Sequence, residues 1–244
     1  MKSELVAEFS VPAGKVSVIP FGINNTVSTT KLSTEDAKRS LRISRTNKTM
    51  LFFGHIAPYK GLEYLVAALQ ELTRKDENYR LIIAGTPKGC EEYWEQIKQG
   101  FVRMRKREQI IERIEYIPDD QTELYFKAAD VLILPYRHIF QSGVLFLGYN
   151  FGLPAIAADV GSLREDIVEG RTGYIFQPND TADLAKTIEA YFSSPLYREL
   201  ETQRHEIRDY ANERYSWVKA GKITSNIYQT LLAQCSGRSG GIHG

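Results

Sequence analysis

The sequence predicts an α/β domain built on a doubly wound, mostly parallel sheet. Short apolar runs alternate with helical patterns from residue 50 to residue 192, and Gly or Pro follows most of the runs. Such alternation is typical of parallel strands joined by right-handed crossovers, with helices on both faces of the sheet.

Each predicted element depends on its own pattern. Apolar residues at 62, 65, 66, 69 and 72 form the stripe of an amphipathic helix, and the next apolar run, LIIAG, is typical of a buried strand. The strands expected from such runs lie at residues 16–20, 50–54, 81–85, 114–118, 131–135, 155–159 and 173–176. The helices expected between and after them lie at residues 62–72, 91–103, 122–129, 142–152, 182–192, 195–209 and 217–232.

The pattern also suggests three parts of the chain. Residues 1–15 are expected to be the end of a missing N-terminal domain or a linker helix, because one helical stretch leads directly into the first strand. Residues 16–235 would form the folded domain. Residues 236–244 contain four glycines in nine residues and are expected to be a disordered tail.

Charge and cysteine content exclude several classes of function. Thirty-one basic and thirty acidic residues leave a net charge of +1, so we expect no nucleic-acid partner. No apolar run approaches the roughly 18 residues of a membrane span, so we expect no membrane insertion by this chain. Cys90 and Cys235 fit neither a disulfide framework nor a metal site, which favours the reducing cytoplasm, where the full-length protein could still lie at a membrane surface.

Two turns stand out as candidate binding elements. The first, GHIAPYKG at residues 54–61, leaves a strand and places Lys60 at the start of a helix. The second leads into a helix that opens at Ser142 and Gly143. Free backbone N–H groups and the helix dipole make such an opening suitable for phosphate or carboxylate. A lysine at a helix start opposes the dipole, so Lys60 either pairs with an anion or is an ordinary solvated lysine.

The order of these segments carries a resemblance to a known family. VSVIPFGIN, LFFGHIAPYKGLEYLVAAL, YRLIIAG, IEYIPDDQTELYFKAADVLILPY and SGVLFLGYNFGLPAIAADVGSLREDIVEGRTGYIFQPND follow one another in the chain. Together they resemble the nucleotide-sugar domain of a GT-B glycosyltransferase of the family 4 type, the glycosyl transferases group 1. The resemblance covers residues 16 to 232 and implies one Rossmann-like half of a GT-B fold, with C-terminal helices.

The resemblance implies a retaining glycosyltransferase that transfers a hexosyl group from a nucleoside diphosphate sugar to an unknown acceptor. The nucleotide sugar is a substrate, and neither a metal nor another cofactor is expected. The acceptor would be bound mainly by an N-terminal domain that this chain lacks, so the chain alone is expected to be inactive.

The resemblance also assigns donor-binding residues. Lys60 matches the family lysine that holds the donor diphosphate, beside Gly54, and His55 stands where the family has an arginine. The amides of Ser142, Gly143 and Val144 would cradle phosphate.

The sugar and base contacts are less complete. The family's two glutamates fall at Ile139 and Leu147, so both acids are missing, and Gln141 and Tyr149 are the neutral polar residues nearby. The base would lie against backbone around Ile117. Glu165 either matches a family acid near the donor cleft or is a first-turn glutamate favoured by the helix dipole. No catalytic residue can be named.

Two other functions remain open. A domain without the acids at Ile139 and Leu147 could be a catalytically degenerate nucleotide-binding or scaffold domain. An unrelated flavodoxin-like or epimerase sheet protein would have the same kind of sheet but would not explain the ordered turns. The sequence does not identify the donor base, the sugar, the acceptor, the pathway or the oligomeric state.

Overall fold

The computed structural model describes residues 2–23, 27, 29–102 and 107–238, and over this range it has one parallel sheet. The strand order is β3-β2-β1-β4-β5-β6, and all neighbouring strands are parallel. Met50 at the centre of the sheet is paired with Leu81 on one side and Val131 on the other. The strands are β1 Lys48–Phe53, β2 Tyr79–Ala84, β3 Ile110–Arg113, β4 Val131–Leu134, β5 Ala155–Ala158 and β6 Gly173–Phe176. The predicted doubly wound fold is confirmed.

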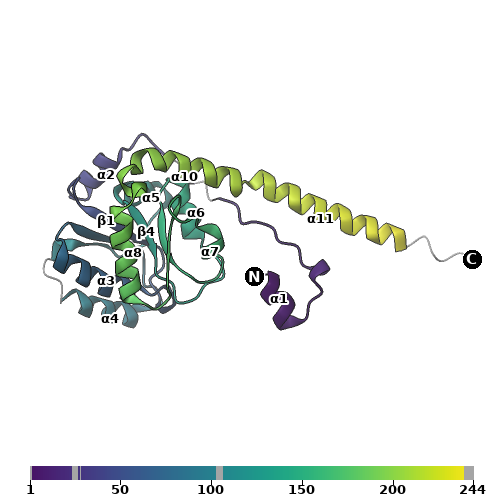
Figure 1. The fold of residues 1–244 in the computed structure, drawn as a ribbon, viewed down its shortest axis with the longest axis horizontal. Helices are drawn as coiled ribbons and strands as arrows, with labels where there is room; N and C mark the ends of the chain where they lie inside the picture. Colours follow the sequence, from purple (N-terminus) through teal and green to yellow (C-terminus); the bar gives the residue numbers. More distant parts are fainter. Residues whose placement is uncertain (1, 24–26, 28, 103–106, 239–244) are drawn as a thin grey trace, which may run out of the picture. The chain divides into compact units, whose positions relative to one another are not determined.

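Helices cover both faces of this sheet (Figure 1). On one face α3 packs against α4 and α8, and on the other α2 packs against α5. Every residue of β4 and β5 is buried, as expected for parallel strands between two helical layers. The helices are α2 Thr34–Ser40, α3 Leu62–Lys75, α4 Glu91–Phe101, α5 Asp119–Ala128, α6 Gly143–Asn150, α7 Leu163–Asp166, α8 Thr181–Ser193, α9 Pro195–Arg198 and α10 Leu200–Arg214.

Local sequence explains where these helices form. All five apolar positions of the α3 stripe, from Leu62 to Leu72, are buried against the sheet layer. Helix α8 begins after Asp180, whose side chain accepts a hydrogen bond from the Asp183 amide, as an N-cap residue should. Hydrophobic periodicity therefore explains the buried face of α3, and capping explains where α8 begins.

Three predicted elements were wrong in position or extent. Residues 16–20 form neither strand nor helix, and Val18 and Ile19 are exposed, because no described strand pairs with them. The strand predicted at residues 114–118 lies earlier, at β3, where Ile110 and Ile111 pair with β2. The helix predicted at 195–209 is interrupted between α9 and α10.

The chain divides into two compact units. One consists of Asn24–Asp209 and contains the sheet, and the other consists of Met1–Ile23 with Tyr210–Gly244. The second unit contains α1 Lys2–Phe9 and α11 Trp217–Arg238. Within it, the Ile23 amide donates to the Tyr215 carbonyl at 2.9 Å, and Trp217 Nε1 donates to the Ile23 carbonyl at 3.0 Å.

The predicted three-part division remains a prediction. Helix α11 includes the first three residues of the predicted tail, and residues 239–244 lie outside the described part of the chain. Among the described residues, no helix combines the length and the apolar character needed to cross a membrane.

The turn before β5 gives a test of packing. Gly152 has a φ of +65°, and a Cβ added there would lie 2.1 Å from the carbonyl oxygen of Arg204 on α10. Gly152→Ala should therefore destabilise the protein by about 1–3 kcal/mol or more, from backbone strain and the clash. Urea unfolding would measure this loss. Gly221→Ala is the control, because nothing lies within 4 Å of the added Cβ in α11; equal stability of the two variants would contradict the prediction.

Candidate functional site

The two turns singled out in the sequence meet at the carboxyl ends of neighbouring strands β1 and β4. The Arg137 amide, after β4, donates a hydrogen bond of 2.8 Å to the carbonyl of Tyr59. Gly61 has a φ of +64°, and a Cβ there would lie 2.1 Å from the carbonyl oxygen of Pro135. Only glycine fits this approach without displacing the β4 turn.

Gly54 brings the helix opening into the same group. Its φ is +94°, and an added Cβ would lie 3.2 Å from Lys60 Nζ and 3.7 Å from Val144 Cγ2. Gly54, Lys60 and Val144 therefore surround one point in space, although 90 residues of sequence separate the first from the last. The missing side chain of Gly54 leaves that space free for a ligand or water.

Lys60 is the most unusual charge in this group. It ends the short helix η2 Pro58–Lys60, and only 5% of its surface is exposed. Its ammonium lies 5.5 Å from the centre of the Tyr136 ring, and it has no hydrogen bond or ion pair with any residue the structure describes. Burial lowers its pKa from 10.5 to about 8. The interpretation of Lys60 as a solvated lysine is therefore wrong, and an anion beside it would be stabilised.

Helix α6 supplies backbone donors next to this lysine. It begins at Gly143, with Ser142 as N-cap, and the Ser142 side chain makes no capping hydrogen bond. The Ser142 hydroxyl lies instead 3.4 Å from the hydroxyl of Tyr136, beneath the turn. The first amides of an α-helix have no intrahelical acceptor, and the helix dipole adds partial positive charge. The helix opening at Ser142 is confirmed.

An ionic network that the sequence interpretation missed supports both turns. Arg137 forms an ion pair with Glu63 in the first turn of α3, with Nε 2.9 Å from the carboxylate, and Tyr93 of α4 donates to the same carboxylate. The hydrogen bond to Glu63 raises the pKa of Arg137, so the guanidinium stays charged. The sequence signal that could have pointed to this network was Arg137, a cation in the turn that follows β4.

A third turn joins the same edge of the sheet. After β5, the Ser162 amide donates to the Phe140 carbonyl at 3.0 Å. A Cβ on Gly161 would lie 1.9 Å from the Ile139 carbonyl oxygen, so these backbones are in direct contact. Glu165, exposed in α7, therefore lies one turn away from the loop that holds Ile139.

The other predicted residues fall into two groups. His55 and Gln141 are half-buried and keep part of their surface accessible, whereas the side chains of Ile117 and Leu147 are buried. Tyr149, considered as a possible polar contact, is fully buried, and its hydroxyl donates toward the Asp166 carbonyl and Thr172 Oγ1. Tyr149 thus anchors α6 to the β5–β6 region.

Among the described residues, no cluster of His, Cys, Asp and Glu side chains could hold a metal ion. The polar groups of the site are instead one buried cation, the amides of a helix start and the accessible surfaces of His55 and Gln141.

Comparison of the chain with known proteins identifies its family. Residues 33–214 match the family described as "Glycosyl transferases group 1". An uncharacterised glycosyltransferase of Methanocaldococcus jannaschii is 27% identical over 235 residues, which cover 95% of this chain and 58% of that protein. The chain thus spans less than two thirds of the length of this curated relative.

Two solved structures show the same fold. The C-terminal domain of a glycosyl transferase group 1 family protein from Francisella tularensis matches with a TM-score of 0.67 and 18% identity, over 80% of this chain and 100% of that domain. The Anabaena protein HepE in complex with UDP-glucose matches with a TM-score of 0.75 and 19% identity, over 95% of this chain and 61% of that protein.

The burial of Lys60 has a consequence for stability that can be measured. Its folded pKa of about 8 lies below the unfolded value of about 10.5, so between these values the unfolded state binds more protons. Stability should therefore increase as pH rises from 8 toward 10.5, by about 2–4 kcal/mol from this group. Urea unfolding at both pH values should show the increment in the parent chain and not in Lys60→Met.

Lys186→Met is the control, because Lys186 is exposed on α8. This variant should keep the pH-dependent increment. If Lys60→Met kept it as well, the buried ammonium would not be its source.

Proposed function

The chain belongs to the glycosyl transferases group 1 family, and on that premise we propose that it holds the nucleotide-sugar donor of a retaining hexosyltransferase. The observation that carries this proposal is the position of Lys60, which is buried, has no ionic partner among the described residues and lies beside the start of α6. A binding site with one unpaired buried cation and free helix amides favours a diphosphate over a neutral ligand.

In this proposal the diphosphate lies between Lys60 and the amides of Ser142, Gly143 and Val144. The anion would raise the pKa of Lys60 and keep the ammonium protonated, while Gly54 leaves room for the approach. His55 lies in the same turn, keeps part of its surface accessible and is proposed to contact the diphosphate. The Glu63–Arg137 pair keeps the two turns in register and acts on the ligand only through them.

The base and the sugar of the donor would be held mostly by uncharged groups of the protein. We propose that the base lies against backbone around Ile117, and that Gln141 replaces the carboxylate missing at Leu147, since Tyr149 faces inward. Glu165 is proposed to contact the sugar from the third turn. Exchange of a charged hydrogen bond for a neutral one costs about 1 kcal/mol, or several-fold in affinity. Neither a metal nor another cofactor is part of this proposal.

The acceptor would be bound mainly outside this chain. The chain covers 58% of the length of its Methanocaldococcus relative, which supports a further domain in the full-length protein. We place the enzyme in the cytoplasm, at a membrane surface if the rest of the protein binds one, because Cys90 and Cys235 suit a reducing compartment.

Nucleotide binding can be tested by thermal unfolding with UDP, GDP, ADP and their glucose conjugates. A ligand at 100 times its dissociation constant should add about 2.7 kcal/mol of stability. We expect one base to give a clear shift, and Lys60→Ala to remove most of it, because the diphosphate loses its cation. Lys186→Ala, on the exposed surface of α8, should leave the shift unchanged.

An unchanged shift in Lys60→Ala would exclude Lys60 from the site. No shift with any of the six ligands at millimolar concentration would favour the alternative function, a degenerate scaffold domain. The buried leucine at position 147 is the observation that favours that alternative.

Sugar transfer gives a separate test. The purified 244-residue chain, incubated with the nucleotide sugar that it binds and with water or simple sugars as acceptors, should release no nucleoside diphosphate above background. The reason is that the acceptor face would belong to another domain. Measurable turnover by this chain would contradict that division of labour, whatever the binding result.

A further inference from the structure

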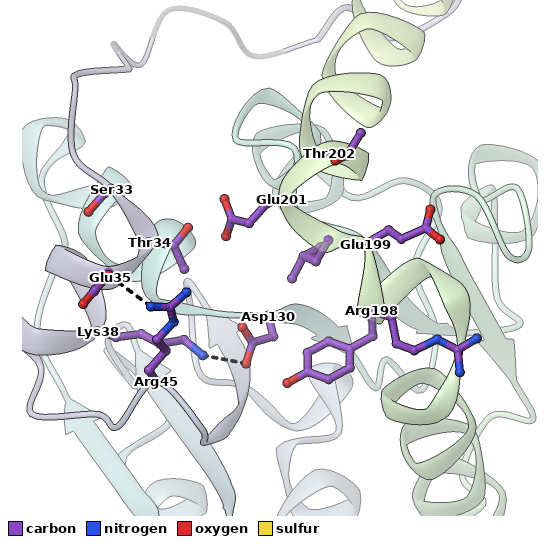
Figure 2. Close-up of a pocket in the computed structure, with 12 residues that line it drawn as sticks. Ser33, Thr34, Glu35, Lys38, Arg45, Asp130, Arg198, Glu199, Glu201 and Thr202 are labelled. Carbon is purple, nitrogen blue, oxygen red and sulfur yellow. Dashed lines mark hydrogen bonds and ion pairs between the residues drawn. The ribbon is translucent and has the colours of Figure 1, made fainter.

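A polar cavity lies at the end of the sheet opposite the candidate site, beside the amino ends of β1 and β4. It has a volume of about 760 Å³ and lies between α2 and the α9–α10 junction (Figure 2). All its residues belong to the unit Asn24–Asp209. They are Ser33, Thr34, Glu35, Lys38, Arg45, Asp130, Tyr197, Arg198, Glu199, Leu200, Glu201 and Thr202.

The floor of this cavity is a buried ion pair. Lys38 Nζ lies 2.9 Å from Asp130 Oδ2, and the two side chains are 5% and 6% exposed. Lys38 also donates to the Asn47 carbonyl at 3.0 Å, and Asp130 Oδ2 also accepts from the Thr49 amide at 2.8 Å. The pair thus joins α2 to the first residues of β1 and β4.

This pair leaves hydrogen-bonding capacity unused. Asp130 Oδ1 accepts no hydrogen bond from any described residue, and the ammonium of Lys38 has used two of its three protons. Asp130 lines the cavity, so water or a ligand there can supply a donor to this oxygen. The floor therefore offers one strong acceptor and one donor side by side.

The wall opposite the ion pair, at α9 and α10, adds further hydrogen-bond donors and acceptors. Tyr197 lines the cavity together with Asp130, and burial and the charge of Asp130 raise the pKa of Tyr197 to about 12, so its hydroxyl stays protonated. That hydroxyl has no hydrogen bond among the described residues. Figure 2 shows the Glu201 carboxylate extending from α10 toward Thr34, above Asp130.

The charges of the cavity nearly cancel. Lys38, Arg45 and Arg198 are cationic, and Glu35, Asp130, Glu199 and Glu201 are anionic. Arg45 lies 3.6 Å from Glu35, so part of this charge is already paired (Figure 2). This balance disfavours a phosphate or another multiply charged anion, whereas a hydroxyl group, which both donates and accepts, matches the mixed lining.

We propose that this cavity binds a small neutral polyol, a mono- or disaccharide, at a site separate from the nucleotide-binding turns. The volume lies within the range of about 300–1,000 Å³ that small-molecule sites occupy. One sugar hydroxyl would donate to Asp130 Oδ1, and others would accept from Lys38 Nζ and the Tyr197 hydroxyl. This proposal does not depend on the identity of the nucleotide or on transfer activity.

The test is a titration of the full 244-residue chain with glucose, maltose and sucrose, each up to tens of millimolar. Binding is monitored by saturation-transfer NMR. We expect at least one of these sugars to bind. Tyr197→Phe keeps the ring packed 4.7 Å from that of Phe192 and removes only the hydroxyl, and Glu201→Gln removes an exposed charge. Each should weaken binding about three- to tenfold.

Glu206→Gln is the matched control, because Glu206 is exposed on the same helix and does not line the cavity. Its affinity should equal that of the parent chain. The proposal is overturned if none of the three sugars binds, or if both cavity variants bind as well as Glu206→Gln. It is also overturned if UDP displaces the sugar or Lys60→Ala weakens it, because the sugar would then occupy the nucleotide-binding turns.

Discussion

The candidate site depends on the contact between the turns that follow β1 and β4. Gly61 lies against the Pro135 carbonyl, and the Arg137 amide binds the Tyr59 carbonyl, so neither turn can move alone. This contact holds Lys60 in a buried position next to the first amides of α6. A larger residue at position 61 would separate the cation from the amides, and the site would lose its concentrated positive potential.

Much of the fold could be predicted because its strands are short, apolar and buried on both faces. The runs around β1, β2, β4, β5 and β6 all lie near their predicted positions. The run at residues 16–20 has a similar composition, but no strand in the described part of the chain pairs with it, so composition alone misleads there. At β3, the pairing with β2 selects Ile110 and Ile111, and that choice depends on contacts that no local pattern contains.

The candidate site could be predicted only in part from the sequence. Ligands bind at the carboxyl ends of parallel strands, and the resemblance to the family grouped Lys60 with Ser142. The contact between their turns depends on the pairing of β1 with β4, which only the structure shows. The burial of Lys60 and the Glu63–Arg137 pair could not be read from sequence, because they depend on tertiary packing. The ion pair on the cavity floor joins Lys38 to Asp130, which lie 92 residues apart in the sequence. These two charged residues form no motif, so the pair could not be predicted either.

The start of α6 has a consequence for how such a domain can change over generations. Its donors are main-chain amides, so mutation of the helix leaves them in place as long as a helix still begins at Gly143. Leu147 is buried and Ile139 is half-buried, and the helix still begins at Gly143 with these residues in place. A lineage can therefore exchange the side chains around this helix start, while the main-chain donors are inherited intact.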